Sequence, residues 1–92
     1  MKTFEQIIED KFNNGEKEII FFFDFRNNPV DESLFNNNLF ALNFEDFDIN
    51  RLFYEDYQNE LEKFDMYINQ PAFFYFKNRK EVDIIEIIDY KK

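Results

Sequence analysis

Residues 19–25 read Ile19-Ile20-Phe21-Phe22-Phe23-Asp24-Phe25, a run that stays apolar up to its aspartate. The run is β-branched and aromatic, and it does not alternate between apolar and polar positions. A strand with one buried face alternates, whereas a strand that is covered on both faces is apolar throughout. This stretch therefore predicts a central strand in a sheet with helices on both faces.

A first helix is predicted before this strand, from about Phe4 to Phe12. Residues 3–6, Thr-Phe-Glu-Gln, form a capping box, and apolar residues follow at helical spacing. Asn14 or Gly15 can adopt the left-handed conformation that ends a helix.

A second helix is predicted directly after the strand. Asn28 is a suitable N-cap, Pro29 suits the first helical position, and Asp31 and Glu32 complement the positive end of the helix dipole. Asparagines at 36–38 weaken the middle of this helix. Its apolar stripe would consist of Leu34, Phe35, Leu39 and Leu42.

The second half of the chain predicts two β-strand regions separated by a helix. Residues 46–53 indicate a strand, and residues 57–64 a helix with a solvated acidic face. Residues 72–76 and 82–88 are expected to be two strands joined by a polar turn at 78–80. The predicted order is α-β-α-β-α-β-β, an α/β fold with a four-stranded mixed sheet in a single domain spanning residues 1–92.

The composition excludes several kinds of chemistry. The 92 residues include fifteen Phe and five Tyr, no Cys and no His, and the net charge is −9. Disulfide frameworks, thiolate or histidine metal sites and Ser-His or Cys-His nucleophiles are thereby removed. No apolar run is long enough to cross a bilayer, and the acidic N-terminus is unlike a signal peptide. A cytoplasmic protein is expected, with no direct binding to nucleic acid or membrane.

Two segments resemble the thioredoxin-like family. Residues 22–25, Phe-Phe-Asp-Phe, resemble the strand end that precedes the family's dithiol motif, and residues 26–33 occupy the place of that motif. Residues 71–78, Pro-Ala-Phe-Phe-Tyr-Phe-Lys-Asn, resemble the proline-led strand near the family's last hairpin. The likeness covers roughly residues 4–88. It lacks the family's first strand and most of its closing helix, since only residues 89–92 remain.

This resemblance implies a three-layer thioredoxin-like fold with a binding groove in place of a redox site. The cysteine positions fall at about Val30 and Ser33, so disulfide exchange is absent. The family pattern implies a cis Gln70–Pro71 bond beside a groove for an extended peptide. The alternative is an ordinary trans proline at the start of a strand. The groove residues would be Asn28, Pro29, Val30, Ser33, Gln70 and Pro71.

Acidic residues gather between positions 45 and 65. They are Glu45, Asp46, Asp48, Glu55, Asp56, Glu60, Glu62 and Asp65. Such a face could bind a basic partner or imitate a row of phosphates. The simpler interpretation is a solvated face that keeps an aromatic-rich protein soluble.

Individual residues with possible chemistry have plainer interpretations. Residues 46–50 match the opening of a calcium loop, but Arg51 and Tyr57 stand where that loop needs Gly and Glu. Ser33 has no base to activate it, and Asp24 is expected to be a structural acceptor. No catalytic residue, metal site or cofactor is therefore expected.

The isoleucines near the C-terminus suggest a partner. One face of a strand cannot bury all of Ile84, Ile85, Ile87 and Ile88, so a homodimer or a hetero-complex is expected.

Three functions follow from the sequence. The first is a non-catalytic thioredoxin-like protein-binding module. The alternative is a small acidic inhibitor of the phage type, for instance an anti-CRISPR or other anti-defence protein, that blocks a basic nucleic-acid-binding groove by charge mimicry. A residual enzyme ranks last, because the carboxylates have neither a metal cage nor a second reactive group.

Overall fold

The computed structural model describes residues 2–88, which form three helices and a four-stranded mixed sheet. In chain order the elements are α1 (Phe4–Asn13), β1 (Glu18–Asp24), α2 (Glu32–Ala41), β2 (Ile49–Phe53), α3 (Tyr54–Lys63), β3 (Ala72–Lys77) and β4 (Lys80–Glu86). The strands lie in the order β2-β1-β3-β4, so β1 is inside the sheet, as residues 19–25 predict.

The sheet combines one parallel and two antiparallel pairs. β1 runs parallel to β2 and antiparallel to β3, with Phe21 opposite Phe74. β3 and β4 form the predicted hairpin. Its turn residues, Asn78 and Arg79, both have positive φ values, 52° and 70°, as the two-residue turns that match strand twist require.

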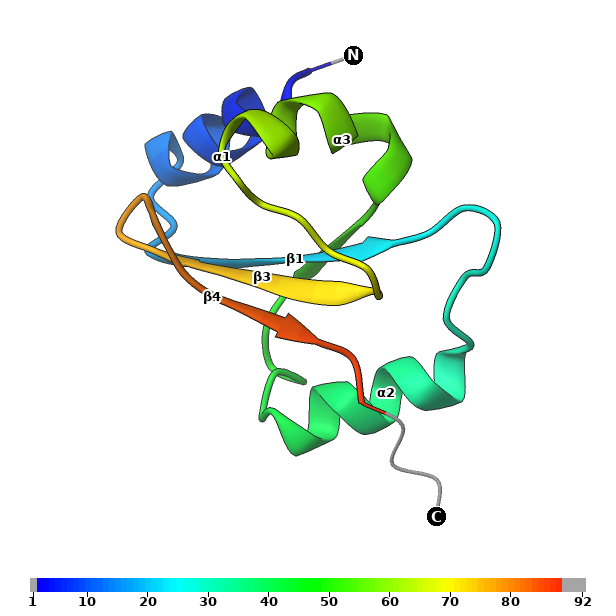
Figure 1. The fold of residues 1–92 in the computed structure, drawn as a ribbon. Helices are drawn as coiled ribbons and strands as arrows, with labels where there is room; N and C mark the ends of the chain where they lie inside the picture. Colours follow the sequence, from blue (N-terminus) through cyan, green and yellow to red (C-terminus); the bar gives the residue numbers. More distant parts are fainter. Residues whose placement is uncertain (1, 89–92) are drawn as a thin grey trace.

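The side chains of β1 divide between two apolar clusters, one on each face of the sheet. Ile19, Phe21 and Phe23 belong to the first cluster, which also contains buried residues of α1 and α3. Figure 1 shows α1 and α3 on one side of the sheet and α2 on the other. The continuous apolar run is thus explained, because successive strand residues point to opposite faces and both faces are buried.

Aromatic rings fill both clusters. In the first, the ring of Phe4 meets that of Phe21 edge-on, with the centroids 4.8 Å apart. In the second, the ring of Phe22 contacts those of Phe35 of α2 and Phe73 of β3, and both centroid distances are 4.8 Å. The contacts of Phe4 with Phe21 and of Phe22 with Phe35 are edge-to-face, which suits the ring quadrupole.

The predicted start and end of α1 are confirmed. The Thr3 side chain accepts from the Gln6 N–H, and the Gln6 side chain accepts from the Thr3 N–H. Gly15 follows the helix with φ +97°, in the left-handed region.

The predicted start of α2 is wrong. The N-cap is Asp31 rather than Asn28, and Pro29 lies outside the helix. The Asn28 N–H donates to the Phe25 carbonyl, and the Val30 N–H donates to the Asp24 carboxylate. These bonds hold residues 25–30 in a loop, so the helix begins only where Asp31 can accept from the Leu34 N–H.

The boundaries of the next two elements also differ from the prediction. β2 begins at Ile49 rather than near residue 46, because the Phe47 N–H closes a turn with the Phe44 carbonyl. α3 begins at Tyr54, directly after β2 and without a side-chain cap, which removes the usual sequence signal. Its buried residues are Tyr54, Tyr57 and Leu61.

The isoleucines near the C-terminus are shared between the two faces. Ile84 packs against the first cluster, Ile85 and Ile87 against the second, and Ile88 is 52% exposed. β4 ends at Glu86, before the predicted boundary. The argument for a homodimer or hetero-complex is thereby weaker, although the complex itself stays a prediction.

No helix within residues 2–88 combines the length and the apolar character that are needed to cross a membrane. The expected truncation of the family's closing helix concerns residues 89–92, which lie outside the described residues.

Candidate binding groove and acidic residues

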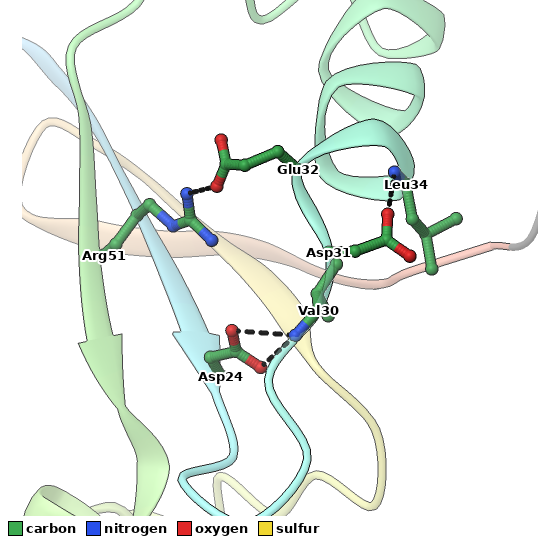
Figure 2. A network of polar contacts seen from close by, with 6 residues as sticks. All are labelled: Asp24, Val30, Asp31, Glu32, Leu34 and Arg51. Atoms are coloured by element: carbon green, nitrogen blue, oxygen red, sulfur yellow. Dashed lines mark hydrogen bonds and ion pairs between the residues drawn. The ribbon is translucent and has the colours of Figure 1, made fainter.

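Asp24 shapes the loop between β1 and α2. Its side chain is buried, and one carboxylate oxygen accepts from the Phe25 N–H at 2.9 Å. Both oxygens accept from the Val30 N–H at 3.1 Å, as Figure 2 shows. The expectation that Asp24 is a structural acceptor is confirmed. The carboxylate fixes residue 30 relative to the end of the central strand.

One contact caps α2, and another attaches its start to the sheet. Asp31 Oδ1 accepts from the Leu34 N–H at 2.8 Å, and Glu32 pairs with Arg51 of β2 at 2.6 Å (Figure 2). The Arg51 guanidinium also lies 4.0 Å from the ring centroid of Phe35. Charge pairing and the cation–π contact together connect β2 to the first turn of α2.

A cavity of about 250 Å³ lies between this loop and Pro71. Its lining consists of Asn28, Pro29, Val30, Asp31, Leu34, Pro71 and Ile87. The loop and Pro71 are far apart in the sequence, and the fold brings them to the same hollow.

The predicted groove is therefore assembled in part. Asn28, Pro29, Val30 and Pro71 line the cavity, whereas Ser33 is exposed on α2 and does not, and neither does Gln70. Sequence reasoning missed Asp31, Leu34 and Ile87. Leu34 could have been found, because it lies one turn beyond the cap. Ile87 could not, because it is placed by a bond from its N–H to the Pro71 carbonyl.

The Gln70–Pro71 bond is trans, since the described residues contain no cis peptide bond. Pro71 is therefore an ordinary trans proline at the start of a strand, and the cis bond that the family pattern implies is absent. At this position the chain departs from the thioredoxin-like pattern.

A second hollow adjoins the first at Pro29. It measures about 310 Å³ and is lined by Asp24, Pro29, Arg51, Leu52 and Phe53. Elsewhere, a hollow of about 240 Å³ lies beside α1, where Phe64 is 53% exposed and adjoins Met66 and Ile8. The sequence analysis predicts no site at this surface, where Phe64 is the C-cap residue of α3.

The predicted acidic residues do not form one face. Glu45, Asp46 and Asp48 precede β2 in a loop whose Phe44 and Phe47 pack against the second cluster. Residues 55–62 lie on α3, whose buried side chains belong to the first cluster on the opposite side of the sheet. Asp65 follows α3.

Most of the acids on α3 bind the chain itself. The Glu60 carboxylate accepts from the Phe4 N–H at 2.8 Å and the Glu5 N–H at 2.9 Å, and so caps α1. Glu55 accepts from the Arg26 N–H, and Asp56 pairs with the Arg26 guanidinium at 2.6 Å. These carboxylates have structural partners, and a bound partner would have to compete with them.

Four of the predicted acids have no such partner. Within residues 2–88, the structure gives no hydrogen bond or ion pair to the side chains of Glu45, Asp46, Asp48 and Asp65. All four are exposed. Among the predicted acidic residues, these four carboxylates are available to an outside partner.

Titratable chemistry at these surfaces is limited. Among the described residues, no group of three or more acidic side chains is arranged to hold a metal ion. Three tyrosines have raised pKa values. The hydrogen bond to Glu18 raises the pKa of Tyr75, and burial raises the pKa of Tyr54 and Tyr57.

The comparisons with known protein families and curated proteins identify no relative of this chain. No protein-family model matches the chain, and a search of the curated proteins finds no match.

Proposed function

We propose that this chain is a non-catalytic protein-binding module with a thioredoxin-like fold, in which helices cover both faces of the sheet. The strand order β2-β1-β3-β4, with β2 parallel to β1 and the last two strands in a hairpin, supports this proposal. The trans bond before Pro71 is the feature that departs from it.

The observation that carries the proposal is the shared lining of the groove. The loop after the central strand and Pro71 before β3 line one cavity, at the place where the family resemblance puts its site. Val30 and Leu34 provide apolar surface, and Asn28 and Asp31 provide polar groups at the same hollow. This combination suits an extended segment with one apolar side chain.

The site would bind a partner protein without catalysing disulfide exchange. Val30 and Ser33 occupy the cysteine positions, so there is no thiolate to attack a disulfide. The module would work in the cytoplasm by binding a segment of a partner protein in this groove. It would do so alone or as part of a homodimer or hetero-complex.

Filling the groove tests the proposal. A partner captured from host extract with the full chain is identified, and its affinity is then measured for Asn28→Trp and for Asn27→Trp. Asn28 lines the cavity and Asn27 does not, yet both are exposed loop residues. Asn28→Trp should weaken binding by about tenfold or more, whereas Asn27→Trp should change it by less than about threefold. Equal affinities for the two variants would refute the groove.

A second candidate is a phage-type acidic inhibitor that imitates nucleic acid. Glu45, Asp46 and Asp48 favour it, because their carboxylates are exposed and have no partner within residues 2–88, whereas the structural roles of Glu55, Asp56 and Glu60 do not. Mimicry predicts that binding to a nucleic-acid enzyme weakens steeply as salt rises. Binding that is insensitive to salt would exclude it.

A further inference from the structure

The outer side of β2 has no partner within residues 2–88. β2 is the last strand on its side of the sheet, with only β1 beside it. No backbone group of Ile49–Phe53 bonds to a loop or side chain of the described residues. Its outward N–H and C=O groups can therefore pair with another chain.

The opposite edge of the sheet is protected, and β2 is not. β4 has exposed charges at Lys80, Asp83 and Glu86, and an irregularity interrupts its pairing beside Tyr75. Such charges and bulges prevent edge-to-edge pairing. In β2 the sole charged residue is Arg51, whose guanidinium is held by Glu32 and the ring of Phe35.

Acidic residues flank both ends of this edge. Glu45, Asp46 and Asp48 precede β2, and Glu55 and Asp56 follow it, all of them exposed. Glu55 and Asp56 both bind Arg26, so this end keeps one net negative charge, from two carboxylates and one guanidinium, and the end before β2 is the more acidic. A second copy of the chain paired along β2 would bring these acids against one another in either orientation. Like charges placed opposite each other in a sheet are destabilising, so the charge pattern opposes self-pairing and favours a basic strand.

A hollow lies at the end of the β1–β2 pair. Leu52 and Phe53 of β2 line this cavity of about 310 Å³ together with Asp24 and Pro29. A strand added to β2 would point alternate side chains to each face of the sheet, and one of them could enter this hollow.

We propose that the outer edge of β2 docks an extended segment of a partner protein that is apolar at its centre and basic at its ends. The segment joins the sheet as a further strand, with backbone hydrogen bonds to β2 and its lysines or arginines near the flanking acids. The hollow beside β2 shares Pro29 with the groove at Pro71, but no residue of β2 lines that groove, so either site can fail without the other.

The probe is a synthetic peptide with five alternating valine and threonine residues, matched to the five residues of β2, between two pairs of lysines. Titration with the full chain should slow amide hydrogen exchange in residues 49–53. A peptide that is N-methylated at each central residue keeps the charges but loses the backbone donors, and it should bind at least about tenfold more weakly.

Charge reversal provides the matched pair of variants. Glu45→Lys/Asp46→Lys/Asp48→Lys should weaken binding by about tenfold or more. Glu16→Lys/Asp83→Lys/Glu86→Lys makes the same change in net charge at exposed positions away from β2, and should weaken it by less than about threefold.

Three results would overturn the proposal. Equal binding of the methylated peptide would show attraction by charge alone, and equal effects of the two triple variants would remove the role of the acids near β2. Slowed exchange in residues 49–53 without peptide, together with a dimer in sedimentation, would show that a second copy occupies the edge.

Discussion

Asn38 shows how a single buried polar side chain can join distant parts of this fold. It is 1% exposed, and its amide nitrogen donates to the Leu34 carbonyl at 2.9 Å and the Ile88 carbonyl at 2.8 Å. Its amide oxygen accepts from the Ile88 N–H at 2.9 Å. The side chain thereby connects α2 to the segment after β4.

Replacing Asn38 by leucine should destabilise the protein. The change removes these bonds and leaves the backbone groups of Ile88 without a partner, so the free energy of unfolding should fall by about 2–4 kcal/mol. Urea denaturation measures the change. Asn37→Leu, at an exposed neighbouring position, should alter the free energy by less than about 0.5 kcal/mol. Similar losses for both variants would contradict the role given to Asn38.

Because the pKa of Tyr75 is raised in the folded protein, we expect the protein to lose stability at alkaline pH. The Tyr75 hydroxyl donates to Glu18 at 2.5 Å, and this bond raises the pKa of the folded tyrosine above its ordinary value of 10.0. The folded protein therefore holds the proton more tightly than the unfolded chain does. The stabilisation is complete below pH 10 and is lost as the pH rises from there through the folded pKa.

Tyr75→Phe should make stability fall less steeply above pH 10. Unfolding free energies measured across this range test the prediction, and tyrosinate absorbance locates the titration. Tyr54 and Tyr57, whose pKa values burial raises, should retain part of the slope. An unchanged slope in the Tyr75 variant would contradict the assignment.

At the scale of the elements, α2 begins where Asp31 caps it. Asp31→Ala should lower the free energy of unfolding by about 1 kcal/mol, because the Leu34 N–H loses its acceptor. Asn28→Ala should have an effect of less than about 0.5 kcal/mol, since the Asn28 side chain caps nothing. Thermal or urea unfolding compares the two. A larger loss for Asn28→Ala would restore the helix start that the sequence predicts.

Elements whose signals are local could be predicted, and those that depend on distant contacts could not. The apolar run at 19–25 predicted a central strand, and the capping box at residues 3–6 predicted α1. The start of α2 was wrong because buried Asp24 binds the Val30 N–H, which sequence spacing does not reveal. Likewise, nothing distinguishes Asn38 from its two neighbouring asparagines until Ile88 lies beside it.

At the scale of the whole molecule, the candidate site was predicted in part. The resemblance placed Asn28, Pro29 and Val30 beside Pro71, and these residues share a cavity. The acidic residues did not form the expected single face, because α3 and the loop before β2 lie on opposite sides of the sheet. Sequence proximity alone could not separate them.

The most direct measurement is a hydrogen-exchange footprint of the full chain with its captured partner bound. A groove that accepts an extended segment should show slowed amide exchange at Val30, Leu34 and Ile87, which line the cavity. The Asn28→Trp variant should lose this footprint. A footprint confined to other surfaces, such as α3, with the exchange of these three amides unchanged, would contradict a binding module that works through the groove at Pro71.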